Sequence, residues 1–225
     1  MSPTTANFDR LAPTYRVLEY LAFGRVLQHA RAVLLPHLSS CGNVLLVGDG
    51  DGRCLEALGR LAPNARVTSV DASGAMIELS RRRVAKSGFA SRVTFVQTDV
   101  RSWPCPPRRF DAIVTMFFLD CFTAADVDAI VASLTPGLQT GGRWLFVDFA
   151  IPGAGLARLY ARLLVKTLYA FFRSQTHIEA HALPPAEAIL EHHGFRPRVV
   201  REFRAGLVRC VLLVHQTTRP ILPSK

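Results

Sequence analysis

Residues 44–71 read VLLVGDGDGRCLEALGRLAPNARVTSVD, and this stretch decides the fold class. The apolar run 44–47 predicts a buried strand, and three alternating glycines follow it. A helix-compatible segment comes next, and then a second strand that ends at Asp71. Glycine reaches turn dihedrals that strain other residues and lets a ligand approach the backbone. An acid at the tip of the second strand can accept both hydroxyls of a ribose. The stretch therefore predicts an adenosine-containing cofactor.

The spacing of these glycines separates two kinds of cofactor site. The dinucleotide fingerprint G-x-G-x-x-G needs a glycine three places after the second one, where this chain has Arg53. The spacing found, G-x-G-x-G, resembles motif I of the class I S-adenosylmethionine-dependent methyltransferases. For so short a motif, a tight turn that binds no ligand is the alternative.

Composition sets limits on the fold and the compartment. The chain has 225 residues, of which 49% are hydrophobic and 20% charged, as in one globular domain. Its five cysteines lack paired metal-type spacing and no secretory signal is evident, so we expect reduced thiols in a cytoplasmic protein. No apolar run is long enough to span a bilayer.

The net charge of +10 is uneven along the chain. Residues 151–225 hold 11 of the 27 Lys and Arg but only 4 of the 17 Asp and Glu. Such an excess suits nucleic acid, an anionic membrane or no charged partner at all. The chain has no basic track interleaved with aromatics, no Asn-Pro-Pro-aromatic motif after the fourth strand and no added RNA-binding module. The sequence therefore argues against nucleic acid as the partner.

Strand and helix patterns alternate along most of the chain. The predicted strands are 43–47, 66–70, 92–97, 111–116 and 143–149, and the predicted helices are 8–36 (divided at Pro13 and Gly24), 53–61, 75–87 and 124–134. Ser73 is suited to cap the helix 75–87, and Gly141-Gly142 predicts a turn into the fifth strand. This alternation indicates a parallel sheet covered on both faces. The patterns at 198–203 and 208–215, joined by a turn with Gly206, predict a final antiparallel hairpin.

Residues 8–215 resemble a class I methyltransferase, and look like the ubiquinone/menaquinone-biosynthesis C-methyltransferases and related small-molecule enzymes. The segments that carry the resemblance are FDRLAPTYRVLEYLAFG (8–24), TDV (98–100), FDAIV (110–114), LQTGGRWLFVDF (138–149) and ILEHHGF (189–195). The resemblance implies a Rossmann-like α/β fold with a seven-stranded, mainly parallel sheet, one antiparallel strand in the C-terminal hairpin, and helices on both faces. It also implies a single domain over 1–225, which comprises a helical cover (1–40), a cofactor-binding core (41–150), a helical lid and substrate region (151–195) and the terminal hairpin (196–216).

The resemblance implies S-adenosylmethionine as the cofactor. Asp71 matches the family's ribose-binding acid, and Asp99 matches the acid that meets the adenine amino group. The cofactor-binding residues expected on this basis are Gly48, Asp49, Gly50, Asp51, Gly52, Asp71, Ala72, Asp99, Val100 and Met116.

The chain departs from the family at three places. Leu46 stands where relatives have an acid that helps hold the methionine amino group. Either Asp49 or Asp51 substitutes for that acid, or the cofactor binds weakly. Thr140 replaces a proline before the glycine pair, and residues 153–185 match the quinone enzymes poorly. The substrate of those enzymes is therefore not carried over.

Methyl transfer needs an aligned nucleophile and exclusion of water, and a general base helps when the acceptor is a phenol or an amine. Asp120, just beyond the fourth strand, is the first candidate for a catalytic base, with a helix or turn cap as the alternative. His177 is the second candidate. Its HIEAH context (177–181) lacks the H-E-x-x-H spacing, so no metal site is expected.

Four residues are candidates for binding the substrate: Tyr15, Phe117, Phe118 and Asp148. The two phenylalanines, together with Phe122, would form an apolar pocket for a flat acceptor, or else belong to the core. Asp148 lies near the end of the fifth strand, on the ligand side of the sheet, with an ion pair to a nearby arginine as the alternative.

The segment 155–173, GLARLYARLLVKTLYAFFR, predicts an apolar helix with a basic stripe formed by Arg158, Arg162, Lys166 and Arg173. A lid over a hydrophobic site is the interpretation we favour. Peripheral contact with an anionic membrane is the second, and packing against another subunit is the third. A lid and a membrane contact would both suit a lipophilic acceptor. The predicted function is therefore methyl transfer to a small lipophilic or aromatic acceptor (quinone-like, phenolic or lipid). The alternatives are a nucleic-acid methyltransferase and a catalytically silent protein of the same fold, which Leu46 supports.

Overall fold

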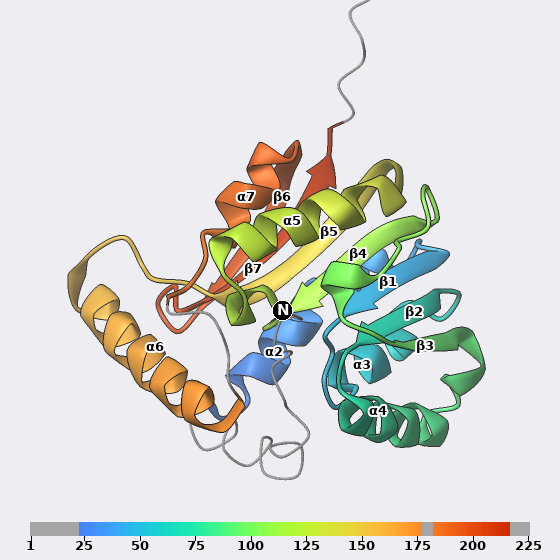
Figure 1. The fold of residues 1–225 in the computed structure, drawn as a ribbon, viewed down its shortest axis with the longest axis horizontal. Coiled ribbons are helices and arrows are strands. Elements are labelled where there is room, and N and C mark those ends of the chain that lie inside the picture. Colours follow the sequence, from blue (N-terminus) through green and yellow to red (C-terminus); the bar gives the residue numbers. More distant parts are fainter. Residues whose placement is uncertain (1–22, 177–181, 217–225) are drawn as a thin grey trace, which may run out of the picture.

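A computed structural model of the chain describes residues 23–176 and 182–216. Its centre is a seven-stranded sheet with the order β3-β2-β1-β4-β5-β7-β6, so that β3 and β6 form the two edges (Figure 1). Strand β7 is antiparallel to both of its neighbours, and the other pairs are parallel. The predicted sheet, with one antiparallel strand in a C-terminal hairpin, is confirmed. The strands are β1 Asn43–Val47, β2 Arg66–Asp71, β3 Val93–Gln97, β4 Phe110–Met116, β5 Leu138–Phe149, β6 Phe195–Phe203 and β7 Val208–His215.

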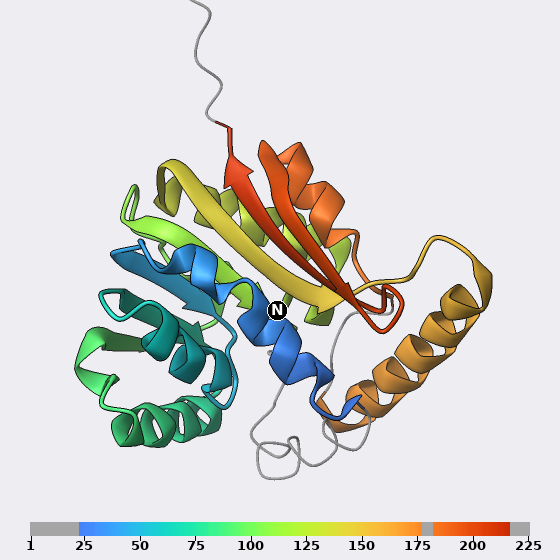
Figure 2. The same ribbon diagram turned by 180° about the vertical axis from the view of Figure 1, so that it is seen from behind.

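Helices cover both faces of the sheet, as expected for strands that are apolar on both sides (Figures 1 and 2). Helices α2 and α3 pack on one face, where Leu46 belongs to the core, and α5 and α7 pack on the other, where Leu45 does. The helices are α2 Val26–Val33, α3 Arg53–Leu61, α4 Gly74–Lys86, α5 Ala124–Leu134, α6 Gly155–Thr176 and α7 Ala186–His192. The predicted helix over 8–36 coincides with the structure at α2, and its part before residue 23 lies outside the described residues.

Local signals explain where the helices begin. The Ser73 hydroxyl accepts a hydrogen bond from the Met76 amide at 3.1 Å and so caps α4, as predicted. The Thr123 hydroxyl caps α5 in the same way, because it accepts from the Asp126 amide at 3.2 Å. The cap of α5 is therefore Thr123, which leaves the nearby Asp120 carboxyl group available for another role.

Strand β5 differs from its prediction. It begins at Leu138, and Gly141-Gly142 lie within the strand instead of ending a turn before residue 143. The pairing with β4 shifts between Phe110 and Ala112, opposite this segment, and Gly141 has a φ of +72°. The glycines thus permit a bulge, which lets the strand continue across an irregularity. Strand β6 also begins earlier than predicted and is irregular between Pro197 and Val199.

Helix α6 stands beside the sheet and does not lie along it, as both ribbon views show (Figures 1 and 2). Ala161 and Val165 are buried and belong to the same core cluster as Leu27 and Ala30 of α2. The opposite side of the helix exposes four large apolar side chains, Leu156, Leu159, Tyr160 and Leu163. Among the described residues, no helix combines the length and the apolar character that crossing a membrane requires.

All five cysteines are free thiols in the structure. Burial raises the pKa of Cys105 to about 11 and that of Cys210 to about 12. These two thiols therefore stay protonated and unreactive at neutral pH.

Candidate active site

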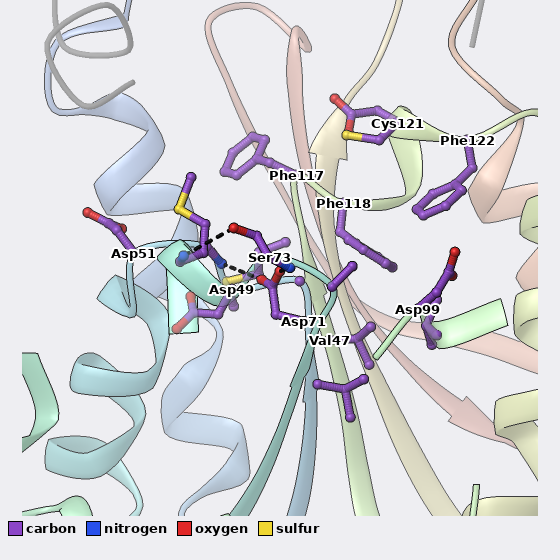
Figure 3. Close-up of a pocket in the computed structure, with 18 of the residues that line it drawn as sticks. Val47, Asp49, Asp51, Asp71, Ser73, Asp99, Phe117, Phe118, Cys121 and Phe122 are labelled. Carbon is purple, nitrogen blue, oxygen red and sulfur yellow. Dashed lines mark hydrogen bonds between the residues drawn. The ribbon is translucent and has the colours of Figure 1, made fainter. Parts of the chain in front are cut away.

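A pocket opens at the carboxyl ends of β1, β2 and β4, where parallel sheets place their ligands (Figure 3). The predicted residues that line it are Gly48, Asp49, Gly50, Asp51, Asp71, Ala72, Asp99, Val100, Met116, Phe117, Phe118 and Asp120. Gly52 and Asp148 lie just behind this lining, within the surrounding packing. Tyr15 and His177 lie outside the described residues, so their predicted roles stay predictions. The structure thus brings the cofactor candidates and the first catalytic candidate together.

The glycine turn is shaped by the packing of the chain itself. A Cβ atom on Gly48 would lie 2.0 Å from the Phe118 ring, and one on Gly52 would lie 2.7 Å from the Cα of Ser80. Both glycines also have positive φ, +66° and +84°. The sequence predicted close approach of a ligand, whereas at these two positions the close neighbours are an aromatic ring and helix α4.

Asp71 points toward the turn from the end of β2 (Figure 3). One carboxylate oxygen accepts from the Gly50 amide at 3.3 Å, and the other accepts from the Ser73 amide at 2.9 Å. Two backbone donors thus hold the Asp71 carboxylate at the pocket wall, and its predicted contact with a ribose stays a prediction.

Asp99 lies across the pocket from this turn (Figure 3). The Arg101 guanidinium donates to its carboxylate at 2.7 Å, and the Arg101 amide donates at 2.9 Å. Burial alone would raise the pKa of Asp99, but these hydrogen bonds outweigh it and hold the pKa below its ordinary value. Asp99 is therefore ionised and firmly positioned at neutral pH. Its predicted contact with an adenine stays a prediction.

The two acids inside the turn are engaged within the protein. The Asp49 carboxylate accepts from the Cys54 and Leu55 amides at 3.1 and 2.9 Å and so caps α3. The Asp51 carboxylate forms ion pairs with Arg53 and Arg83 at 2.8 and 2.9 Å. Both acids still line the pocket, so the prediction that one of them replaces the acid missing at Leu46 stays untested.

Asp120 lies in the turn after β4, at the floor of the pocket. Its amide donates to the Asp148 carboxylate at 3.1 Å, and the Tyr169 hydroxyl of α6 donates to its carbonyl oxygen at 2.5 Å. Burial raises the pKa of Asp120 to about 6. The arginine opposite Asp148 in the sheet, Arg209, pairs with Glu187 and Glu202. The Asp148 carboxylate thus accepts from the Asp120 amide, and Arg209 pairs with other acids.

Similarity to known proteins agrees with this arrangement. A family model described as a methyltransferase domain matches residues 44–142. The demethylmenaquinone methyltransferase of Thermus thermophilus is 30% identical over 166 residues, which cover 73% of this chain and 74% of that protein. The chain belongs to the class I S-adenosylmethionine-dependent methyltransferases.

Other proteins that are similar to this chain are longer than the region that matches it. The ubiquinone/menaquinone biosynthesis C-methyltransferase UbiE of Pseudomonas paraeruginosa is 28% identical over 152 residues, which cover 66% of this chain and 59% of that protein. Among solved structures, the mitomycin 7-O-methyltransferase MmcR superposes with a TM-score of 0.69 at 22% identity, over 93% of this chain and 61% of that one. The chain thus matches about three fifths of the length of these two proteins, and the structural likeness supports the fold.

The residues of the pocket fit the cofactor of the methyltransferase family. Asp71 and Asp99 are two carboxylate acceptors in its lining, which could meet ribose hydroxyls and an amino group. Apolar side chains of Val47, Val70 and Val100 also line the pocket and suit a flat base.

Arg31 and Tyr169 are among the pocket residues that were not predicted from sequence. Arg31 of α2 is only 6% exposed, and its guanidinium carbon lies 4.7 Å from the Phe117 ring centroid. An arginine on the buried face of α2 was a readable signal, because cations are rarely buried without a role. Tyr169 reaches the pocket from α6, and its partner Asp120 is 49 residues away, so sequence offered no signal for it.

Four phenylalanines, Phe117, Phe118, Phe122 and Phe149, line the pocket and form an aromatic wall. The first three are labelled in Figure 3. The rings of Phe118 and Phe122 meet edge to face at 5.0 Å, and those of Phe117 and Phe149 lie 5.2 Å apart. Phe117 has a φ of +52°, a conformation that costs a bulky residue energy and is often found at functional sites. Within residues 23–176 and 182–216, no three His, Cys, Asp or Glu side chains are grouped to hold a metal ion.

Proposed function

We propose that the protein transfers a methyl group from S-adenosylmethionine to a small lipophilic or aromatic acceptor. The observation that carries the proposal is the convergence of Asp71, the glycine turn and Asp120 on one pocket at the carboxyl edge of the sheet. Asp71 would hold the ribose, and Asp120 lies where it can meet an acceptor. The family assignment supports the same cofactor.

The roles of the chain's own residues follow from the geometry. The backbone donors to Asp71 orient its carboxylate before a ligand arrives, so little ordering remains to be done on binding. The aromatic wall formed by Phe117, Phe118, Phe122 and Phe149 excludes water from the side of the pocket opposite Asp71. The cofactor supplies a methyl group that is already strongly electrophilic, so the protein's task is alignment. Asp120, with a pKa of about 6, is ionised at neutral pH and can take a proton from the acceptor.

The aromatic wall supports a flat acceptor. Names of similar proteins point the same way, since one relative is a ubiquinone/menaquinone methyltransferase and one structural neighbour is a mitomycin 7-O-methyltransferase. A small-molecule acceptor is therefore the class we propose, and nucleic acid is not.

Cofactor binding can be tested by calorimetric titration with S-adenosylhomocysteine. The variant Asp71→Asn keeps the shape of the side chain but removes the charge that would accept the ribose hydroxyls. Loss of charged hydrogen bonds costs about 1.5–3 kcal/mol, or roughly 10- to 150-fold in affinity. The matched control is Asp128→Asn, an exposed acid on α5 outside the pocket, which should bind like the wild type.

The three possible results of this titration lead to different conclusions about the cofactor site. Binding that weakens in Asp71→Asn and not in Asp128→Asn supports the cofactor site and justifies a screen of phenols and quinols as acceptors. No binding at millimolar ligand by the wild type would refute the proposed function. Equal affinity in all three proteins would place the ligand elsewhere and would remove Asp71 from the site.

We further propose that α6 makes peripheral contact with an anionic membrane, which would deliver a lipophilic acceptor. Leu156, Leu159 and Leu163 are 87%, 68% and 65% exposed on one side of this helix. Arg158, Arg162 and Lys166 are also exposed on this helix, beside the leucines. An apolar face flanked by cations is the arrangement that binds at the surface of anionic lipid bilayers.

Co-sedimentation with vesicles tests this contact. Vesicles of phosphatidylglycerol and phosphatidylcholine should bind the protein, and vesicles of phosphatidylcholine alone should bind it less. Leu159→Glu should weaken binding about tenfold, because one inserted leucine contributes about 1.5 kcal/mol. Leu61→Glu, at an exposed position on α3, is the matched control and should bind like the wild type. Equal binding by both variants, or no dependence on anionic lipid, would contradict the proposal.

A further inference from the structure

Asp120 and Asp148 form a pair of carboxyl groups at the ends of β4 and β5. The amide of Asp120 donates to one oxygen of Asp148 at 3.1 Å, and the amide of Phe149 donates to the other at 3.0 Å. Each of the two side chains also affects the pKa of the other. Asp120 lines the pocket, whereas Asp148 is 2% exposed and lies behind it. Asp120 is therefore the member of the pair that a ligand in the pocket can meet directly.

Two carboxyl groups in such a place cannot both be ionised at neutral pH without a large cost. Burial, followed by the charge of Asp120, raises the pKa of Asp148 well above its ordinary value. Burial raises the pKa of Asp120 to about 6, and the hydrogen bonds from Cys121 and Asp148 limit this rise. The proton of the pair thus stays on Asp148, and the negative charge stays on Asp120.

The other titratable groups around the pair do not neutralise this charge. Cys121, beside Asp120, has its thiol pKa raised well above the ordinary value by burial, so it stays neutral. Tyr169, from α6, has its pKa raised by burial and by the charge of Asp120 and also stays neutral. Asp71, from β2, adds a further negative charge nearby. The surroundings therefore favour one proton on the pair at neutral pH.

We propose that Asp120 and Asp148 work as a pair that holds one proton and takes up a second one from a hydroxyl group of the acceptor. Asp148 is the positioning residue, since its acid group donates a hydrogen bond that holds the Asp120 carboxylate ionised and oriented. This inference rests on the proposed function, and it narrows the acceptor to molecules with a hydroxyl group that becomes methylated.

Bonds and charges balance in this scheme. The O–H bond of the acceptor breaks, its electron pair stays on the oxygen, and the proton joins the Asp120 carboxylate. The methyl group comes from the positively charged sulfur of the cofactor. As the oxygen–methyl bond forms, the carbon–sulfur bond breaks and its electrons stay on the sulfur. The pair ends the reaction with both carboxyl groups protonated, and Asp120 returns its proton to water.

Infrared spectra of cofactor-free protein labelled with 4-13C-aspartate test the proton count directly. The protein should carry Asp49→Asn, because burial raises the pKa of Asp49 to about 7 and its acid band would overlap. At pH 7 we expect one buried aspartic acid band, which Asp148→Asn removes and the surface control Asp128→Asn keeps. Absence of the band in the Asp49→Asn protein would overturn the proposal. Persistence of the band after Asp148→Asn is added would overturn it as well.

Titration of the same samples separates positioning from simple packing. A second acid band, from Asp120, should appear as the pH falls through about 6. Asp148→Ala removes the hydrogen-bond donor and should raise this midpoint by about one pH unit. Asp148→Asn, whose amide can still donate, should shift it less. Equal midpoints in both variants would overturn the positioning role.

Turnover provides the second readout once S-adenosylhomocysteine binding is shown. With S-adenosylmethionine and a panel of naphthols and hydroxyquinones, Asp120→Asn should lower kcat about 100-fold at unchanged KM. A kcat that is retained in this variant would refute proton uptake by Asp120. The infrared result needs no cofactor, so failure of the carboxyl pair and failure of the proposed function are seen in different experiments.

Discussion

Replacement of Gly52 by alanine should destabilise the protein more than a positive φ alone explains. A non-glycine residue in the left-handed region costs about 1 kcal/mol, and Gly52 has a φ of +84°. Its new Cβ would also lie 2.5 Å from the Ser80 hydroxyl and 2.7 Å from the Ser80 Cα. The second contact is with backbone and cannot be relieved by a rotamer change. Overpacking of this kind adds about 1–3 kcal/mol.

Gly88→Ala is the matched control for Gly52→Ala. Gly88 has a φ of +70°, and a Cβ there would meet no atom within 4 Å. Urea denaturation followed by circular dichroism should give a loss of about 3 kcal/mol for Gly52→Ala and about 1 kcal/mol for Gly88→Ala. For a chain of this size each kcal/mol lowers Tm by about 2–4 °C.

A further variant tests which atom makes the contact. Ser80→Gly added to Gly52→Ala removes the hydroxyl and the Cβ of Ser80 but keeps its Cα, so it should recover part of the loss and not all of it. Equal losses for Gly52→Ala and Gly88→Ala would refute the reasoning. The closeness of α3 and α4 would then not be the reason for glycine at this position.

Two other predictions concern the same pocket. Asp49 has its pKa raised by burial to about 7, so its contribution to stability is complete below the unfolded pKa near 4 and is lost as the pH rises to about 7. Between pH 4 and pH 8, urea denaturation should show the wild type losing about 4 kcal/mol more than Asp49→Asn, and parallel curves would contradict this. Tyr169→Phe leaves the Asp120 carbonyl without its donor and should lower the local stability of α6 and of the turn 119–121 by about 1 kcal/mol. Amide hydrogen exchange in both segments should become faster, and unchanged exchange would count against the contact.

Local patterns predicted much of the fold. The helix α3 was predicted at Arg53–Leu61, and α5 at Ala124–Leu134, as the structure has them. Both helices have clear boundaries, with Gly52 before α3 and the Thr123 cap before α5, and their apolar residues recur at helical spacing. The start of β5 was predicted wrongly at residue 143, because a glycine pair in a sequence cannot distinguish a turn from a bulge.

The pocket was predicted less completely, for physical reasons. The place of Asp71 and Asp120 in the pocket was predicted because Asp71 ends one strand and Asp120 lies just after another, and parallel strands end at one edge of a sheet. The pairing of Asp120 with Asp148 depends on β4 and β5 lying side by side, a register that neither segment specifies alone. Arg31 comes from a helix before the first strand, and its place against Phe117 follows from the packing of that helix on the sheet.

Strand β6 gives the basic charge of the last third of the chain a different meaning. It is an edge of the sheet, and Arg196, Arg198 and Arg201 are exposed along it, with Pro197 among them. Proline offers no amide to an incoming strand, and repulsion between arginines opposes the pairing of two identical edges. The positive charge at this edge thus opposes the pairing of β6 strands from two copies of the chain, a pairing that would extend the sheet into an aggregate.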